Sequence, residues 1–302
     1  MSVEQRIAEL KTRRNAVILA HNYQRPEVQD IADFVGDSLG LSLQATETKA
    51  EVIVFCGVDF MAESAKVLNP EKKVLLPEFE AQCPMAEMLD VPGLLELKAK
   101  HPGASVVSYV NTSAAAKAES DICCTSSNAV KVVQSLDAKK IIFVPDENLG
   151  KWVKRSVPDK EYILWPGYCP THNSITAPMV KVAMAAHPGA KVVAHPECRP
   201  EVLDLADAVC STEGMIKFVK GSDSPEFIIV TEQELLHRLK KLAPTKVFHN
   251  IPGAVCPNMK RITLDSVLRA LTNSTYEVTL PVEVMNRARV PLERMMRVGR
   301  VN

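Results

Sequence analysis

Three cysteines stand out because each is followed by proline and because they recur at almost equal intervals. They are Cys83, Cys169 and Cys256, so the intervals are 169 − 83 = 86 and 256 − 169 = 87 residues. Cysteine thiolates bind soft metal ions and iron–sulfur clusters. We therefore predict that an internal repeat brings the three sulfur atoms to one metal centre.

The number of these cysteines favours an iron–sulfur cluster over a zinc ion. Structural zinc commonly uses four ligands with paired C-x2-C spacing, which these three cysteines lack. Three thiolates on a four-iron cube leave one iron without a protein ligand. By analogy with the open position of catalytic zinc, that iron can bind a substrate oxygen as a Lewis acid. The pattern therefore favours a catalytic cluster over an electron-transfer cluster.

The remaining five cysteines lie in or beside predicted strands, where a free cysteine usually packs as a small apolar residue. They are Cys56, Cys123, Cys124, Cys198 and Cys210. Eight cysteines in 302 residues are too few for a disulfide-based fold, and no export signal accompanies them. We expect a cytoplasmic protein in a reducing compartment.

Polar residues recur with the same period. His21, Tyr109 and His195 each follow an apolar run, at intervals of 88 and 86 residues. A second set, at intervals of 88 and 85 residues, opens helix-like stretches and consists of Ser38, Ser126 and Ser211. Ligands of parallel α/β sheets bind beyond the carboxyl ends of the strands. Any one of these residues is more simply explained as an ordinary boundary residue, but the repetition favours a shared site.

Histidines and a glutamate near these strand ends suit proton transfer. Histidine transfers protons near neutral pH, and the candidates are His21, His172 and His195. Glu197 follows His195 by two residues, so both side chains leave the strand end in the same direction. Tyr23 stands in the same relation to His21.

The serines and a neighbouring threonine suit the binding of an anion. Ser211 and Thr212 stand at a predicted helix start, where free backbone N–H groups bind carboxylate or phosphate. Simple N-capping is the alternative explanation for each serine. Three such helix starts around one axis indicate a substrate rich in negative charge.

Short apolar runs alternate with helical stretches along the whole chain. The first segment contains such runs at residues 17–20, 52–55 and 74–76. This alternation predicts βαβ units with parallel strands buried on both faces. A proline that must end a helix before the last run recurs at intervals of 88 and 86 residues, as Pro70, Pro158 and Pro244.

The repeat predicts an α/β fold of three pseudo-threefold-related, three-layer αβα domains with parallel sheets and the active site at the central axis. The domains would span residues 1–84, 85–171 and 172–302. The last would include closing helices at residues 263–271 and 282–297. The motif His-Pro-Gly-Ala begins at His101 and again at His187, 86 residues later, each time just before a first strand.

Composition excludes several classes of partner. Lys+Arg and Asp+Glu both number 36, so the formal charge is zero and does not support a nucleic-acid or anionic-membrane partner. No apolar run approaches the roughly 20 residues that cross a membrane. The 46% hydrophobic and 24% charged residues are typical of a soluble globular protein.

Longer motifs run in order from about Ala20 to Leu271. They are His21-Asn-Tyr, DIADFVGDSL at 30–39, GVDFMAE at 57–63, Tyr109-Val-Asn, TSSNAV at 125–130, His195-Pro-Glu-Cys, Ser211-Thr and CPNMK at 256–260. Together these motifs resemble the quinolinate synthase family, the A protein of NAD biosynthesis.

The resemblance implies a transferase in which a [4Fe–4S] cluster is held by Cys83, Cys169 and Cys256. It implies condensation of iminoaspartate with dihydroxyacetone phosphate to quinolinate, with loss of phosphate and two waters. An aspartate oxidase or dehydrogenase would supply the iminoaspartate. The implied substrate-binding residues are His21, Ser38, Tyr109, Asn111, Ser126, His172, His195, Glu197, Ser211 and Thr212. The implied catalytic residues are Glu197, Tyr23, His21, His195 and Tyr109.

Three other functions are compatible with parts of the pattern. An iron–sulfur hydro-lyase of another pathway would share the cluster but not the substrates. A non-catalytic, zinc-stabilised α/β protein would use the strand-end residues only as caps. A metal-free isomerase or racemase that uses thiol chemistry would remain active without iron.

Overall fold

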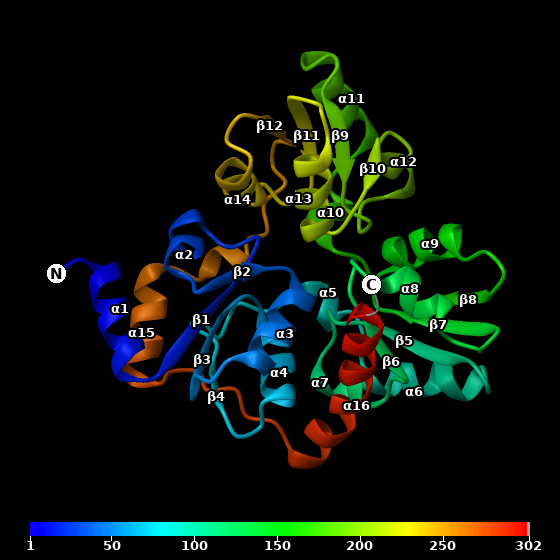
Figure 1. Cartoon of the computed structure of the whole chain (residues 1–302). Coiled ribbons are helices and arrows are strands. Elements are labelled where there is room, and N and C mark those ends of the chain that lie inside the picture. The colour runs from blue at the N-terminus through cyan, green and yellow to red at the C-terminus, as the bar shows by residue number, and fades with distance from the viewer. Residues whose placement is uncertain (301–302) are drawn as a thin grey trace.

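The computed structural model describes residues 1–300 and contains three separate four-stranded parallel sheets. In Figure 1 each sheet forms its own lobe, and the three lobes surround a common centre. The first sheet, in the order β2-β1-β3-β4, consists of β1 (Ala16–His21), β2 (Phe34–Gly36), β3 (Val52–Cys56) and β4 (Lys73–Leu75). The α/β class with parallel strands is therefore confirmed.

The other two sheets have the same order as the first when strands are numbered within each unit. The second consists of β5 (Ser105–Tyr109), β6 (Ile122–Cys124), β7 (Lys140–Val144) and β8 (Glu161–Leu164), in the order β6-β5-β7-β8. The third consists of β9 (Lys191–Ala194), β10 (Ala208–Val209), β11 (Glu226–Val230) and β12 (Val247–Asn250), in the order β10-β9-β11-β12.

Central strands are buried on both faces, as their uninterrupted apolar sequences predict. Ile18 and Leu19 of β1 and Ile53 of β3 are fully buried. Each crossover returns through a helix, because parallel neighbours cannot be joined by a tight turn.

The helices of the first unit are α1 (Val3–Arg13), α2 (Pro26–Ile31), α3 (Ser38–Glu47), α4 (Asp59–Leu68) and α5 (Pro84–Glu87). Those of the second are α6 (Val91–Lys100), α7 (Ala114–Ala118), α8 (Ala129–Gln134), α9 (Glu147–Ser156) and α10 (Pro170–Asn173). Those of the third are α11 (Ala177–Ala186), α12 (Pro200–Leu203), α13 (Thr212–Gly221) and α14 (Leu235–Leu242).

The predicted helix ends are confirmed where proline imposes them. α4 ends at Leu68, α9 at Ser156 and α14 at Leu242, each two residues before the recurring proline. Proline lacks the N–H that would continue the helix, and it disfavours helical backbone in the residue before it.

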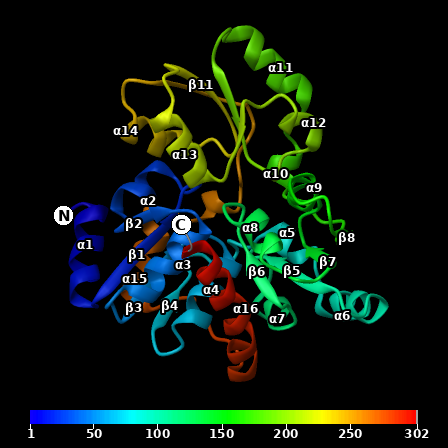
Figure 2. The same cartoon turned by 45° about the vertical axis from the view of Figure 1, so that its right-hand side comes forward.

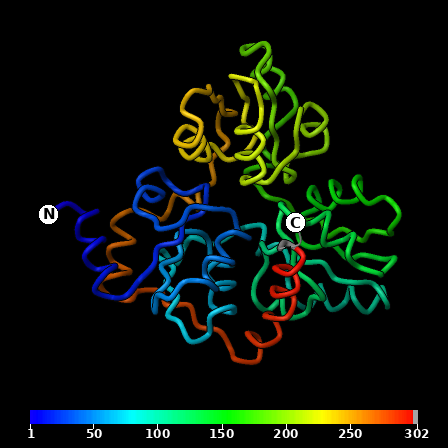
Figure 3. The backbone as a smooth tube through the Cα atoms, viewed as in Figure 1, coloured from blue at the N-terminus to red at the C-terminus, as the bar shows by residue number. Residues whose placement is uncertain are grey.

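The two closing helices pack on the first and second units. α15 (Leu264–Asn273) lies against α1 and β3, and Figure 3 shows α1 and α15 side by side at one edge. α16 (Val282–Arg300) packs on α7, β6 and α4, and in Figure 2 it runs between the first two units.

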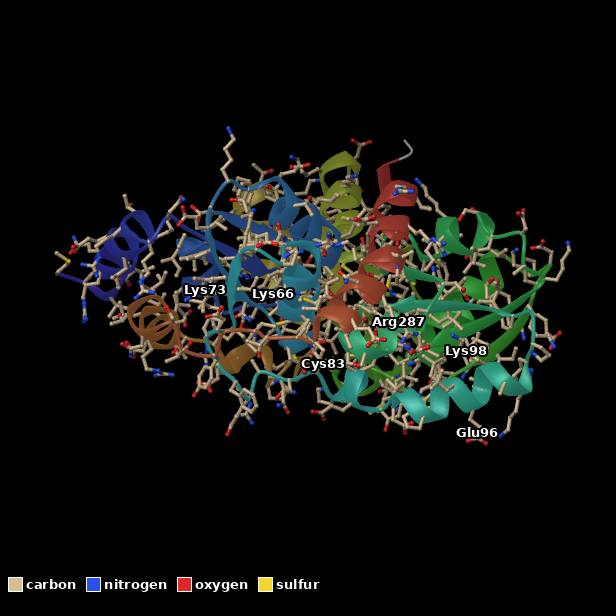
Figure 4. The ribbon with its side chains drawn as sticks, turned by 90° about the horizontal axis from the view of Figure 1, so that it is seen from below. Lys66, Lys73, Cys83, Glu96, Lys98 and Arg287 are labelled. Carbon is tan, nitrogen blue, oxygen red and sulfur yellow. The ribbon has the colours of Figure 1, made fainter. Side chains whose placement is uncertain are left out.

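One ion-pair cluster ties α16 to the second unit. Glu119 accepts from Arg287 at 2.6 Å and faces Lys98 at 3.9 Å, and Figure 4 shows both basic residues on the same side of the molecule. Within the described residues, no helix has both the length and the apolar character needed to cross a membrane.

Candidate active site

A cavity lies where strands of all three sheets end. His21 closes β1, Tyr109 closes β5, and His195 follows β9 directly, and all three side chains line it. Parallel strands bring their carboxyl ends to one edge of each sheet, so residues far apart in sequence meet here. Several apolar side chains, including Phe60, Met61 and Met259, complete the wall.

Almost every residue that sequence motifs marked as functional lines this cavity. They are His21, Tyr23, Ser38, Cys83, Tyr109, Asn111, Ser126, Cys169, His172, His195, Glu197, Thr212 and Cys256. Ser211 is the exception. It is buried, and its Oγ accepts from the Gly214 backbone N–H as the N-cap of α13.

The three recurring cysteines reach the cavity by equivalent routes. Cys83 and Cys169 are the N-cap residues of α5 and α10, each with proline at the first helical position. Cys256 is likewise followed by Pro257, in the loop after β12. All three thiols are free and half-buried, and Figure 4 places Cys83 near the middle of the molecule.

The electrostatics of the thiols suit a bound cationic centre. Burial raises the pKa of all three, and Cys83 and Cys256 further raise that of Cys169. A raised pKa keeps a thiol protonated in the absence of metal, and a bound metal centre supplies the positive charge that stabilises the thiolate form. The donor set therefore fits a metal cluster.

A single metal ion would fit a different set of side chains from the three recurring cysteines. The ligand atoms of Cys169, His172 and Glu197 all lie within 4.8 Å of one another, close enough to share one ion. Within the described residues the three cysteines do not form such a compact set. That wider spacing is expected if each thiolate binds a different iron of one cluster. A lone ion at Cys169 would leave the recurrence of Cys83 and Cys256 unexplained.

Glu197 is the centre of the buried polar network. Its Oε1 accepts from the Tyr109 hydroxyl at 2.5 Å, and its Oε2 lies 2.7 Å from His172 Nδ1. Burial alone would raise the pKa of this carboxyl, but His172 and His195 outweigh that effect and hold the pKa below its usual value. Glu197 is therefore held as a carboxylate.

A chain of hydroxyl and imidazole groups extends from Glu197 to Tyr23. His172 Nε2 lies 2.8 Å from Thr231 Oγ1, which lies 2.6 Å from the Tyr23 hydroxyl. Every group in the chain has a hydrogen-bond partner if the Tyr23 hydroxyl donates to Thr231, the Thr231 hydroxyl donates to His172 Nε2, and His172 Nδ1 donates to Glu197. This chain can carry a proton. Thr231 was not identified from the sequence, because it lies outside the recurring motifs.

The other two histidines are neutral at ordinary pH. Burial lowers the pKa of both His21 and His195 to about 3. The His195 ring stacks on His172 at 4.6 Å, and its Nε2 lies 3.2 Å from Ser126 Oγ. Neutral imidazoles can orient a polar ligand by accepting or donating a hydrogen bond.

Groups that can bind an anion follow the carboxyl ends of β2 and β10 and line the same cavity. Ser38 and Thr212 are the first residues of α3 and α13, where the first backbone N–H groups have no partner within the helix and only one in each helix is capped, by Asp37 and Ser211 respectively. Asn22 Nδ2 donates to Thr212 Oγ1 at 2.7 Å and fixes its orientation. Asn111 Oδ1 is buried without a hydrogen-bond partner among the described residues. A buried, unpaired polar atom on a cavity wall indicates a place for a ligand.

Three carboxyl groups behind the cysteines, one partly buried and two fully buried, were missed in the sequence. The Cys83 N–H donates to Asp59 Oδ1 at 3.0 Å, and the Cys256 N–H donates to Glu232 Oε1 at 3.2 Å. In the second unit the Cys169 N–H acts to lower the pKa of Asp146. Their spacing in the sequence could have revealed them, since the intervals 146 − 59 = 87 and 232 − 146 = 86 match those of the cysteines.

Comparison with known proteins agrees with this arrangement. The family model described as quinolinate synthetase A protein matches residues 5–297. Quinolinate synthase of Methanosarcina barkeri is 58% identical over 295 residues, which cover 97% of each chain. Quinolinate synthase 1 of Methanosarcina acetivorans is 58% identical over 294 residues, covering 97% of this chain and 96% of the relative. Quinolinate synthase of Thermodesulfovibrio yellowstonii is 54% identical over 291 residues, 96% of each chain.

Proposed function

The chain belongs to the quinolinate synthase family and has quinolinate synthase activity, and from this premise we propose that the reaction takes place in the central cavity. One observation carries the proposal: strand ends from three sheets bring thirteen motif residues to a single cavity. The shared strand order and the sequence period support a pseudo-threefold axis through it. The same period supports the proposed domains at residues 1–84, 85–171 and 172–302, the last of which also includes the closing helices α15 and α16, which pack on the first two units.

The substrates are iminoaspartate and dihydroxyacetone phosphate, which condense to quinolinate with release of phosphate and two waters. Both substrates and the product carry negative charge. The helix starts at Ser38 and Thr212, together with the unpaired Asn111, would hold carboxylate or phosphate groups. An aspartate oxidase or dehydrogenase in the same cytoplasm would supply the iminoaspartate.

Cys83, Cys169 and Cys256 would hold a [4Fe–4S] cluster, because free thiols from three separate loops line one cavity. When bound, the cluster would supply a Lewis acid at the iron that lacks a protein ligand. The remaining chemistry falls to the side chains around it.

Glu197 acts as the proton acceptor and donor in this proposal. Isomerisation, ring closure and dehydration all move protons between carbon, nitrogen and oxygen. The carboxylate is ionised and buried, and His172 links it through Thr231 to Tyr23. Tyr109 holds the carboxylate in place through its hydroxyl. His21 and His195, as neutral rings, orient the substrate by hydrogen bonding.

The test is an assay of protein purified without oxygen. We expect quinolinate to form only when iminoaspartate and dihydroxyacetone phosphate are both present, with one phosphate released per quinolinate. Quinolinate formation without dihydroxyacetone phosphate, or dehydration of an unrelated hydroxy acid in place of this reaction, would favour the hydro-lyase alternative.

The carboxylates behind the cysteines lead to a further prediction. Asp59 fixes the loop that presents Cys83, so Asp59→Ala should weaken cluster retention by about 10- to 100-fold, the usual effect of losing an outer-shell partner. Asp59→Asn keeps an oxygen acceptor for the Cys83 N–H and should retain most of the iron. The measurement is the rate at which an iron chelator removes the cluster.

Asp90→Ala is the matched control for Asp59→Ala. Asp90 accepts the Gly93 N–H as the N-cap of α6, so it accepts the same kind of bond but not from a recurring cysteine. Equal cluster loss in the Asp90 and Asp59 variants would show that the effect comes from general destabilisation.

A further inference from the structure

Two histidines and one glutamate meet at the outer end of the third unit, away from the central cavity. His187 is the C-cap residue of α11, Glu226 begins β11, and His249 lies in β12. Figure 1 shows α11 reaching outward from the centre, so its last residues lie at the tip of the molecule. None of the three lines the central cavity or enters the proposed reaction.

The three side chains converge on one point. His249 Nε2 lies 2.7 Å and His187 Nδ1 lies 3.5 Å from the same oxygen, Oε1 of Glu226. The two imidazole rings stack with centroids 3.4 Å apart and an interplanar angle of 15°. One candidate ligand atom from each side chain lies within 4.8 Å of the others.

From this geometry we infer that His187, Glu226 and His249 form a second metal site, which binds a zinc-type divalent cation. Two imidazoles and one carboxylate form a common ligand set of zinc in proteins. The side chains are 32%, 34% and 22% exposed respectively, so an ion can enter and a water can complete the coordination.

The surrounding charges favour a cation at this point. His187 follows the last turn of α11, a ten-residue helix whose C-terminal end carries partial negative charge. Two lysines of the same unit are engaged elsewhere: Lys191 pairs with Asp207 at 2.7 Å, and Lys246 lies over the Phe227 ring. Phe227 points to the sheet face opposite Glu226, because successive strand residues alternate.

The second unit shows that the fold does not require this cluster. Subtracting the 86-residue period places His101, Lys140 and Ile163 at the corresponding positions. The strand pairing agrees, since Ile142 lies beside Ile163 just as Ile228 lies beside His249. The same βαβ architecture therefore forms with a histidine alone at this corner. Glu226 and His249 replace the Lys140 and Ile163 of the second unit, so the complete ligand set indicates a role other than folding.

The experiment is a calorimetric titration of the cluster-containing protein with zinc chloride under anaerobic conditions, while the visible absorption of the cluster is recorded. We expect one zinc ion to bind per chain with no change in the cluster absorption. His187→Gln and His249→Gln should each weaken binding by more than about 100-fold, because loss of a direct ligand costs at least as much as loss of an outer-shell partner.

His237→Gln is the matched control. His237 is also a partly exposed histidine that contacts a carboxylate, at 2.7 Å from Asp30, but Lys241 pairs with the same carboxylate. Zinc binding should be unchanged in this variant. Three results would each overturn the inference. They are no zinc binding, zinc binding by the His187 and His249 variants as tight as that of the unchanged protein, and zinc binding only as the cluster absorption is lost. Glu226→Gln provides an independent test if a histidine variant is unstable.

Discussion

Replacing Cys83, Cys169 or Cys256 by alanine is expected to abolish quinolinate formation. The proposed cluster has one protein ligand at each of three irons, so loss of any thiolate should leave it exposed and poorly retained. Lewis-acid assistance contributes several kcal/mol, and about 1.4 kcal/mol corresponds to a factor of ten. Turnover should therefore fall by at least about 1,000-fold, together with the iron content. Iron analysis and the quinolinate assay on the same samples measure both.

Cys210→Ala is the matched control for the cysteine series. Cys210 is also free and half-buried, but it does not line the central cavity. The variant should keep its iron and its activity. If Cys83→Ala or Cys256→Ala retained full iron while Cys169→Ala lost its metal, the single-ion set of Cys169, His172 and Glu197 would be the better description.

Replacing Glu197 by glutamine should lower turnover by about 100- to 10,000-fold, the usual contribution of one general acid–base group. Glutamine preserves the size of the side chain and can still accept from Tyr109, but it cannot take up a proton. The cluster should remain, because no recurring cysteine is changed. Rapid measurement of quinolinate formation, normalised to iron content, gives the result. Full turnover in an iron-loaded Glu197→Gln sample would exclude the base assignment.

Tyr109→Phe is the companion variant for Glu197→Gln. It removes the hydroxyl that donates to Glu197 at 2.5 Å and leaves the carboxylate bonded to His172. Turnover should fall less than in Glu197→Gln, because the proton-transfer group itself is retained. A larger loss in Tyr109→Phe would indicate that Tyr109 contacts the reacting atoms directly.

The repeat made the sheets and most of the site predictable. Uninterrupted apolar runs located the central strands, and the recurring prolines located the helix ends before the last strand of each unit. The short edge strands β2, β6 and β10 did not appear among those runs. β2 and β10 are partly exposed, as at Phe34, so their sequences lack a continuous buried stretch. β6 is fully buried, but it has only three residues, too few for a recognisable apolar run.

Other details of the site could not be predicted, because they depend on contacts between residues that are far apart in the sequence. The His172–Glu197 pair and Thr231 come from different strand ends, and no sequence period connects them. Burial, which lowers the pKa of His21 and His195, likewise follows from packing and not from residue type. The carboxyl groups behind the cysteines could have been predicted, because Asp59, Asp146 and Glu232 recur with the same period as the cysteines.

The most direct test of the central claim is the content of iron, acid-labile sulfide and zinc per chain in protein purified without oxygen. A [4Fe–4S] cluster on Cys83, Cys169 and Cys256 predicts about four iron and four sulfide per chain. The sulfide should disappear in each of the three alanine variants, and any zinc should depend on His187 and His249. Zinc bound at the central cavity without sulfide, or full quinolinate synthase activity in protein without iron, would contradict the account.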